Sequence, residues 1–231
     1  MRNHQIQPLP PGQPDPIERY APLAFKLLVY SFCAFTFYEA ATTFDEYVPL
    51  HPWPFLINMI HMWIILPMHE GGHFLFMFFG RTLHILGGSF WQVMFPLIWF
   101  ILALRQRSHV APFALFCTGV NIMDVSLYVR DAHFMAMPLL GGDSRGHDWH
   151  NLLSDWGMLD SAVSLGDLLY YAGFILCIAA IAGGIALAFV SFIRPQASIA
   201  LVRSRSSGEI DTLENSVDDF LERKDSRIGR S

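Results

Sequence analysis

The sequence predicts an all-α polytopic membrane protein with four to five transmembrane helices. Three observations predict this class: 53% of the 231 residues are hydrophobic, only 15% are charged, and many of the charges lie near the C-terminal end. Residues 1–193 hold only 21 of the 35 Asp, Glu, Lys and Arg residues, about 11%, whereas soluble domains contain roughly 25%. This composition excludes a disordered chain, a disulfide scaffold and a nucleic-acid-binding protein.

Long apolar runs give the expected spans. A helix needs about 20 apolar residues to cross roughly 30 Å of hydrocarbon. Four runs are long enough, namely residues 22–43, 54–80, 110–129 and 167–193. A fifth run, residues 85–104, contains a Gly-Gly-Ser sequence near its start, followed by Gln92 and Pro96. We expect this fifth run to be a re-entrant segment that enters the membrane and returns to the same side.

The distribution of basic residues supports this expectation, because Lys and Arg near short loops favour the cytoplasmic side. With five complete spans, the basic residues divide almost evenly between the two sides. If residues 85–104 turn back, Arg105 and Arg107 join the side of both termini, and nine of the eleven basic residues counted share that side. Both tails are then expected in the cytoplasm.

The chain divides into three expected parts. Residues 1–20 are rich in Pro and Gln and are expected to form a disordered N-terminal tail. Residues 21–193 form the membrane-embedded domain. Residues 194–231 form a charged cytoplasmic C-terminal tail, in which apolar residues between Ile210 and Leu221 recur at helical spacing and predict a short amphipathic helix.

The second apolar run contains the sequence His69-Glu70-Gly71-Gly72-His73, an HExxH motif. Residues four apart lie on one face of a helix, so both imidazoles can bind one metal ion, and Glu70 can take a proton from a metal-bound water. Ionisable side chains within an apolar helix are costly in a membrane and are therefore functional candidates. Zinc is the expected ion, because the ligands are imidazoles and no thiol is near the motif.

A catalytic zinc site needs a third protein ligand and an open position for water. The polar stretch 141–150 offers candidates, and we expect His147 and Asp148 to supply it: one binds the metal, and the other binds it too or orients its neighbour. The further candidates are Asp143, His150 and Asp124. Asp124 lies within an apolar run, where it can approach the metal or bond to neighbouring helices.

The HExxH helix, the following Gly-Gly-Ser sequence and the later His-Asp-Trp sequence resemble the site-2 protease class of intramembrane zinc metalloproteases. Closer still, residues 54–159 resemble a group of small site-2-protease-like membrane proteins of bacteria. This resemblance implies a metalloprotease-like domain in the bacterial inner (plasma) membrane, with Zn²⁺ held by His69, His73 and Asp148 or His147. Glu70 is then the catalytic base. The Leu-Asp-Gly pattern that usually carries the aspartate in site-2 proteases does not occur in this sequence.

The function favoured by the sequence is a site-2-protease-like intramembrane metallohydrolase, in which Glu70 acts as general base toward a zinc-bound water. Two alternatives stay open: a non-catalytic accessory subunit of a membrane complex with a structural zinc site, and a zinc hydrolase of lipid amides or esters. The expected partners are the lipid bilayer, a membrane-protein substrate or the partners in a membrane complex, and no nucleic acid. Three protein ligands with one open position would favour an enzyme, and four would favour the structural site.

Overall fold

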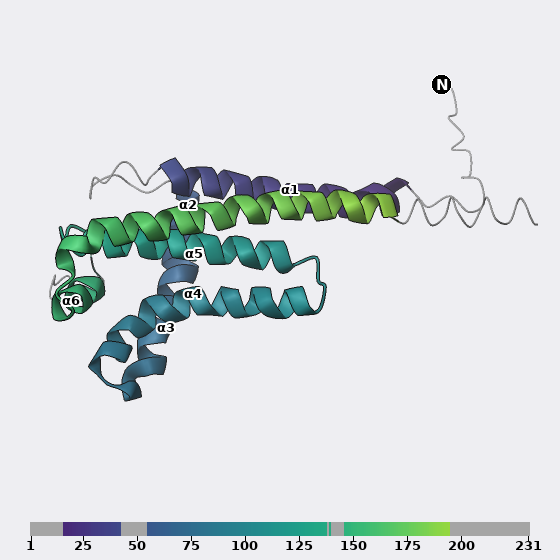
Figure 1. Ribbon diagram of the computed structural model, residues 1–231. Coiled ribbons are helices and arrows are strands. Elements are labelled where there is room, and N and C mark those ends of the chain that lie inside the picture. Colours follow the sequence, from purple (N-terminus) through teal and green to yellow (C-terminus); the bar gives the residue numbers. More distant parts are fainter. Residues whose placement is uncertain (1–15, 43–54, 138, 140–145, 195–231) are drawn as a thin grey trace, which may run out of the picture. The chain divides into compact units, whose positions relative to one another are not determined.

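A computed structural model of the protein describes residues 16–42, 55–137, 139 and 146–194, and these residues contain helices and no strand (Figure 1). Within these described residues, four helices are long and apolar enough to cross a membrane: Ile17–Thr42, Arg81–Arg105, Ala111–Asp131 and Leu159–Arg194. The predicted class, an all-α polytopic membrane protein with four to five spans, is therefore confirmed. The expected amphipathic helix near residue 210 and the candidate ligand Asp143 lie outside the described residues.

The first helix, α1 (Pro16–Thr42), begins before the expected boundary at residue 21. Proline suits the first turn of a helix, where a backbone N–H has no partner within the helix. The helix exposes large apolar side chains at helical spacing, namely Phe25, Leu28, Phe32 and Phe35. A continuous apolar stripe of this kind is unfavourable in water and suits a lipid-facing surface.

The HExxH run is helical without interruption from residue 55 to residue 79, but its hydrogen-bond pattern changes along its length. Its successive parts are α2 (Phe55–Ile60), the π-helix η1 (His61–Ile65), α3 (Leu66–Phe76) and the 3₁₀ turn η2 (Met77–Phe79). Pro67 has no N–H, and its ring excludes the carbonyl four residues earlier, so it disturbs the α-helical hydrogen bonds before it. The Leu66 N–H bonds to the His61 carbonyl in the π-helical pattern.

The predicted re-entrant segment at residues 85–104 is wrong, because these residues belong to one continuous helix, α4 (Arg81–Arg105). The chain reverses earlier, at Gly80, whose φ of 90° is accessible to glycine at little cost. The Gly-Gly-Ser sequence lies inside α4, where Gly87 and Gly88 are buried against α3. Glycine pairs permit close helix contact as well as turns, and here they serve as a packing surface.

Basic residues stand at both ends of α4, because Arg81 begins this helix and Arg105 ends it. Arg130 stands in the last turn of α5. In Figure 1 the segment from α2 to α3 runs across the direction of α4 and α5.

After α4, a short turn leads to α5 (Ala111–Asp131), which runs back beside α4 (Figure 1). The chain continues through α6 (Asp148–Asp155) and η4 (Leu159–Ser161) into a final helix over residues 162–194. Close contacts between small residues join this helix to its neighbours. Gly173 lies against the backbone of Gly119 in α5, and Gly184 lies against the Tyr30 ring in α1.

Residues Ala24–Leu187 form one compact unit, which contains both the HExxH motif and the candidate ligands of α6. Its largest apolar cluster includes Tyr30, Phe116, Met123 and the buried, free cysteines Cys33 and Cys177. The two described chain ends, residues 16–23 and 188–194, belong to a second unit. In that unit the Arg19 guanidinium lies 5.2 Å from the ring centroid of Tyr20 and 5.6 Å from that of Phe192.

Polar side chains of the long helices face the interior. Several of them satisfy their hydrogen bonds within their own helix: the hydroxyls of Thr36, Thr118 and Ser126 donate to carbonyls three or four residues earlier. Such local bonds allow a buried hydroxyl in a low-dielectric environment without a partner on another helix. Gln92 and His69 instead bond across helices.

A pair of adjacent glycines tests the packing of α3 on α4. A Cβ at Gly72 would lie 2.2 Å from the Gly87 carbonyl oxygen, whereas a Cβ at Gly71 would meet nothing within 4 Å. We expect Gly72→Ala to cost about 1–3 kcal/mol and to lower the melting temperature of the detergent-solubilised protein by roughly 5–10 °C. The matched control Gly71→Ala should leave it unchanged or raise it slightly. Equal melting temperatures for the two variants would contradict this packing.

Candidate metal centre

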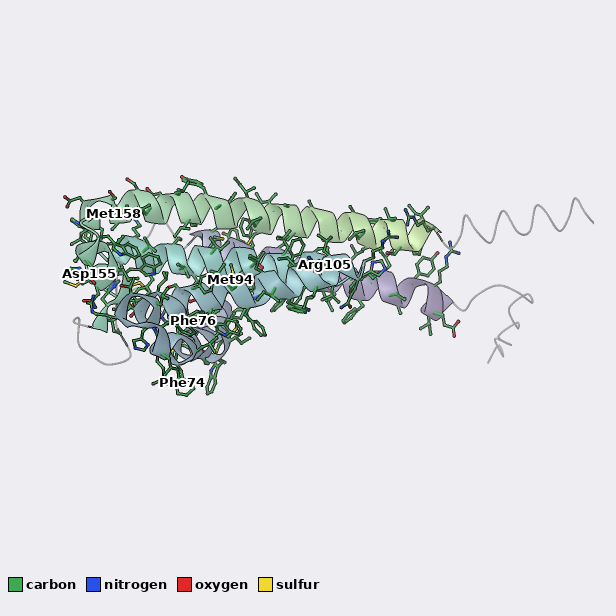
Figure 2. All side chains as sticks on the ribbon, turned by 60° about the horizontal axis from the view of Figure 1, so that its bottom comes forward. Phe74, Phe76, Met94, Arg105, Asp155 and Met158 are labelled. Carbon is green, nitrogen blue, oxygen red and sulfur yellow. The ribbon has the colours of Figure 1, made fainter. Side chains whose placement is uncertain are left out.

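Helices α3 and α4 approach each other closely enough for the HExxH face to lie directly on the α4 backbone. Gly72, between the two motif histidines, faces the Gly87 carbonyl, and the Phe76 side chain covers Gly87. Figure 2 shows Phe74 on the opposite, outer edge of α3, where its side chain is 72% exposed. The two motif histidines, Gly72 and Phe76 therefore lie toward α4, whereas Glu70, Gly71 and Phe74 lie on the exposed side of α3.

Two histidines and one aspartate converge at this contact. The Nε2 atoms of His69 and His73 are 3.0 Å apart, and the Asp148 Oδ2 atom lies 3.1 Å from the first and 3.0 Å from the second. Among the residues that the structure describes, this is the one group of three or more His, Cys, Asp or Glu side chains spaced to hold a metal ion. We call these three residues the metal cluster.

The outer nitrogens of both histidines are engaged elsewhere. The His73 Nδ1–H donates to the His84 carbonyl over 2.8 Å, and the His84 Nδ1–H donates in return to the His73 carbonyl over 2.9 Å. The His69 Nδ1–H donates to Gln92 Oε1 over 3.0 Å. In the neutral rings the lone pairs are therefore on the Nε2 atoms, which face each other and the Asp148 carboxylate. Three acceptor atoms within 3.1 Å of one another are spaced to hold a metal ion between them.

The dimensions and the free space of the cluster suit zinc. Zinc binds imidazole nitrogen and carboxylate oxygen at about 2.0–2.2 Å in tetrahedral geometry, which separates the ligand atoms by about 3.3 Å. The observed separations are a few tenths of an ångström shorter. A Cβ at Gly88 would lie 2.5 Å from His73 Nε2 and 2.6 Å from His69 Nε2. Glycine at this position therefore leaves open the space beside both ligand nitrogens.

Asp148 is positioned by the first turn of α6. Its backbone N–H donates to the Tyr128 hydroxyl over 3.0 Å, and His147 caps the helix by accepting the His150 N–H at Nδ1. These contacts hold the Asp148 carboxylate against the Nε2 atoms of His69 and His73, and a carboxylate is the ionised form that a metal ligand requires.

Each of the four residues from 147 to 150 is attached to a different partner. His147 is fully buried and donates from Nε2 to Asp131, the Trp149 Nε1–H donates to Ser89, and the His150 Nδ1–H donates to the Ala132 carbonyl. Neither His147 nor His150 belongs to the metal cluster. Of the predicted pair, Asp148 thus lies in the cluster, and His147 orients it as the helix cap.

Polar side chains along one face of α5 bond to residues that lie in or next to the metal cluster. Asp124, Tyr128 and Asp131 are spaced four and three residues apart, so they lie along one side of the helix. Tyr128 contacts the backbone of Asp148, and its ring stacks on His147 at 4.4 Å between centroids. Asp131 bonds to His147, while Asp124 bonds to Gln92 and His61 and does not belong to the cluster.

Sequence reasoning missed the roles of Gln92 and Tyr128. In the sequence Gln92 stands out only as a polar interruption of an apolar run, although it follows Gly88 by four residues and so lies on the same helix face. Tyr128 stands four residues after Asp124 in the same way. An apolar run that carries a polar residue one turn from a suspected site residue is the pattern that could have identified both residues.

Glu70 lies between the two histidines of α3 and is exposed. Its carboxylate interacts electrostatically with His73 and with Tyr128, which places its charge close to the cluster. It is absent from the three-residue group itself.

No family model, curated protein or solved structure matches the chain.

The separate roles of the neighbours His147 and Asp148 can be tested by metal binding. We expect the purified protein to bind one Zn²⁺ per chain and to give a tetrahedral cobalt absorption spectrum when Co²⁺ replaces it. Asp148→Ala and His73→Ala should abolish this spectrum, because each removes a ligand atom. His147→Gln should keep the spectrum and weaken zinc binding by about tenfold, because it disturbs only the orientation of a ligand.

The control for these measurements is His109→Gln, which removes an exposed histidine in the turn after α4 and should bind zinc as the wild type does. A His147→Gln variant that loses the cobalt spectrum as completely as Asp148→Ala would make His147 a ligand and contradict this assignment.

Proposed function

We propose that this protein is a zinc metallohydrolase of the bacterial inner membrane, similar to site-2 proteases, that cleaves peptide bonds in membrane-protein substrates. One observation carries the proposal: in the described part of the chain, three protein ligand atoms converge, not four, and an exposed glutamate stands beside them. Three ligands leave a coordination position for water, which is typical of catalytic and not of structural zinc sites.

Each residue of the site then has a defined task. Bound zinc would act as a Lewis acid toward the substrate carbonyl and make water more acidic. His69, His73 and Asp148 would hold the ion, and the hydrogen bonds at both Nδ1 atoms and at the Asp148 backbone would keep them oriented. Glu70 would accept a proton from the attacking water and deliver it to the leaving amine, so that its carboxylate is regenerated.

The exposure of α3 favours access of a substrate from its outer side. Glu70 is exposed, and nothing lies within 4 Å of a Cβ built at Gly71, whereas Gly72 is buried against α4. An extended peptide can therefore approach the backbone of α3 next to the base. We further propose that the four long apolar helices all cross the membrane and that both chain ends lie in the cytoplasm, because five of the seven basic residues in the described part would then share the cytoplasmic side.

A second candidate function is a structural zinc clamp in an accessory subunit of a membrane complex. The observation that favours it is the number of elements that the site joins, because the cluster and its hydrogen-bond partners come from η1, α3, α4, α5 and α6. A metal ion at such a junction would stabilise the fold without any reaction. In that case Glu70 would have no task.

The substitution Glu70→Gln separates the two functions. It removes the base and leaves the three ligands, so we expect unchanged zinc content and a loss of hydrolysis of about 100-fold or more. The readout is the set of new peptide termini, scored by mass spectrometry in membranes of cells that produce wild-type or variant protein, and it requires no chosen substrate. Termini inside or beside apolar segments should occur only with the wild type.

His69→Ala is the matching variant for the metal, and it should lose both zinc and the new termini. A Glu70→Gln protein that behaves as the wild type, while His69→Ala fails to assemble, would overturn the enzyme and support the clamp. Released acyl chains in place of new peptide termini would make lipid amides or esters the substrate.

A further inference from the structure

A chain of polar side chains extends from the metal cluster to η1, away from the reacting position. His69 donates to Gln92 Oε1 over 3.0 Å, Gln92 Nε2 donates to Asp124 Oδ2 over 2.7 Å, and His61 Nδ1 lies 2.8 Å from Asp124 Oδ1. We call these four residues the polar chain. Its members come from α3, α4, α5 and the π-helix.

The chemistry of the carboxylate fixes the direction of every bond in the polar chain. An ionised Asp124 can only accept hydrogen bonds, so both Gln92 Nε2 and His61 Nδ1 must donate to it. The amide of Gln92 is thereby turned so that its oxygen faces His69. That oxygen in turn requires a proton on His69 Nδ1, and it leaves the Nε2 lone pair for the metal.

We propose that Asp124 and His61 are positioning residues, which hold the Gln92 amide in one orientation and so fix the tautomer and ring direction of the ligand His69. This inference rests on the metal site of the proposed function but concerns ligand geometry, not hydrolysis. An amide does not take up or release a proton at neutral pH, so the polar chain transmits orientation and does not conduct protons. Its effect is on the affinity and geometry of the metal site.

The local backbone explains how His61 reaches this position. The π-helical bond between the Leu66 N–H and the His61 carbonyl adds a residue to the turn before Pro67. This extra residue changes the direction of the side chains in η1 relative to those in α3. His61 in η1 thus bonds to Asp124, while His69, eight positions later in α3, bonds to Gln92.

The free-energy cost of burying a carboxylate in an apolar helix supports a function for Asp124 and His61. Asp124 is largely buried within a helix that is apolar enough to span a membrane, with a side-chain exposure of 12%. A charged side chain at such a depth costs several kcal/mol unless it is paired. Replacement of Asp124, His61 and Gln92 by apolar residues would remove this cost. Their presence is explained if the orientation of His69 depends on them.

The test exchanges the acid and amide groups between Gln92 and Asp124. Gln92→Leu leaves the His69 Nδ1–H without an acceptor, and we expect zinc affinity to fall by about 10–100-fold. Gln92→Glu places two carboxylates against each other and should weaken binding by a similar factor. Asp124→Asn should weaken it less, because His61 can change its tautomer and accept.

The double variant Gln92→Glu/Asp124→Asn restores a complete set of hydrogen bonds. The carboxylate at position 92 accepts from His69 and from the amide at position 124, and the oxygen of that amide accepts from His61. We expect its zinc affinity to return to within about threefold of wild type, a recovery that a merely space-filling role of Gln92 would not produce. Zinc affinity is measured on the full-length purified protein by competition with a chromophoric chelator, together with the Co²⁺ absorption spectrum.

Thr118→Val is the matched control on α5, because it removes a buried hydroxyl that donates to the Ala114 carbonyl of its own helix and not to the polar chain. Unchanged affinity in Gln92→Leu, or a double variant no tighter than Gln92→Glu, would overturn the positioning role. A wild-type protein that binds zinc but hydrolyses nothing would overturn the enzyme and leave this inference intact. A wild-type protein that binds no zinc would overturn both.

Discussion

The close contact between α3 and α4 is the constraint on which the remaining structure depends. At Gly72 and Gly87 the two backbones leave no room for a Cβ atom, so the HExxH face and the α4 surface are fixed relative to each other. This contact lets the His73 and His84 side chains each bond to the other residue's carbonyl. It also brings Gln92 under His69. A single larger side chain at the contact would therefore separate the ligands from the groups that orient them.

The sequence was informative where chemistry is local and less so where it depends on packing. The spacing of His69 and His73 places them on one helix face whatever the tertiary structure. Asp148 stood out because the polar stretch 141–150 of this apolar chain contains only a few possible metal ligands. The choice between Asp148 and its neighbour His147 required the structure, since a one-residue step along a helix start changes the side-chain direction completely. Asp124 showed the same limit, because a buried carboxylate in a span can serve a metal or an amide equally well.

The arrangement of spans shows why hydropathy alone was insufficient. Residues 54–80 are apolar, and residues 55–79 are helical, but hydropathy carries no information about Pro67 or the π-helical bond before it. Residues 85–104 contain features that suggest a turn, yet Gly87 and Gly88 pack against α3 and Gln92 bonds to His69 and Asp124. The glycine pair and the polar side chain therefore belong to a packed helix and not to a turn.

The Asp131 carboxylate joins separate parts of the chain at the end of α5. It accepts the backbone N–H groups of Ala136 and Met137 and also the side chain of His147. Loss of this carboxylate would leave all three donors without that partner, which is costly at a buried position. The start of α6, and with it Asp148, therefore depends on an acidic residue that is not part of the metal cluster.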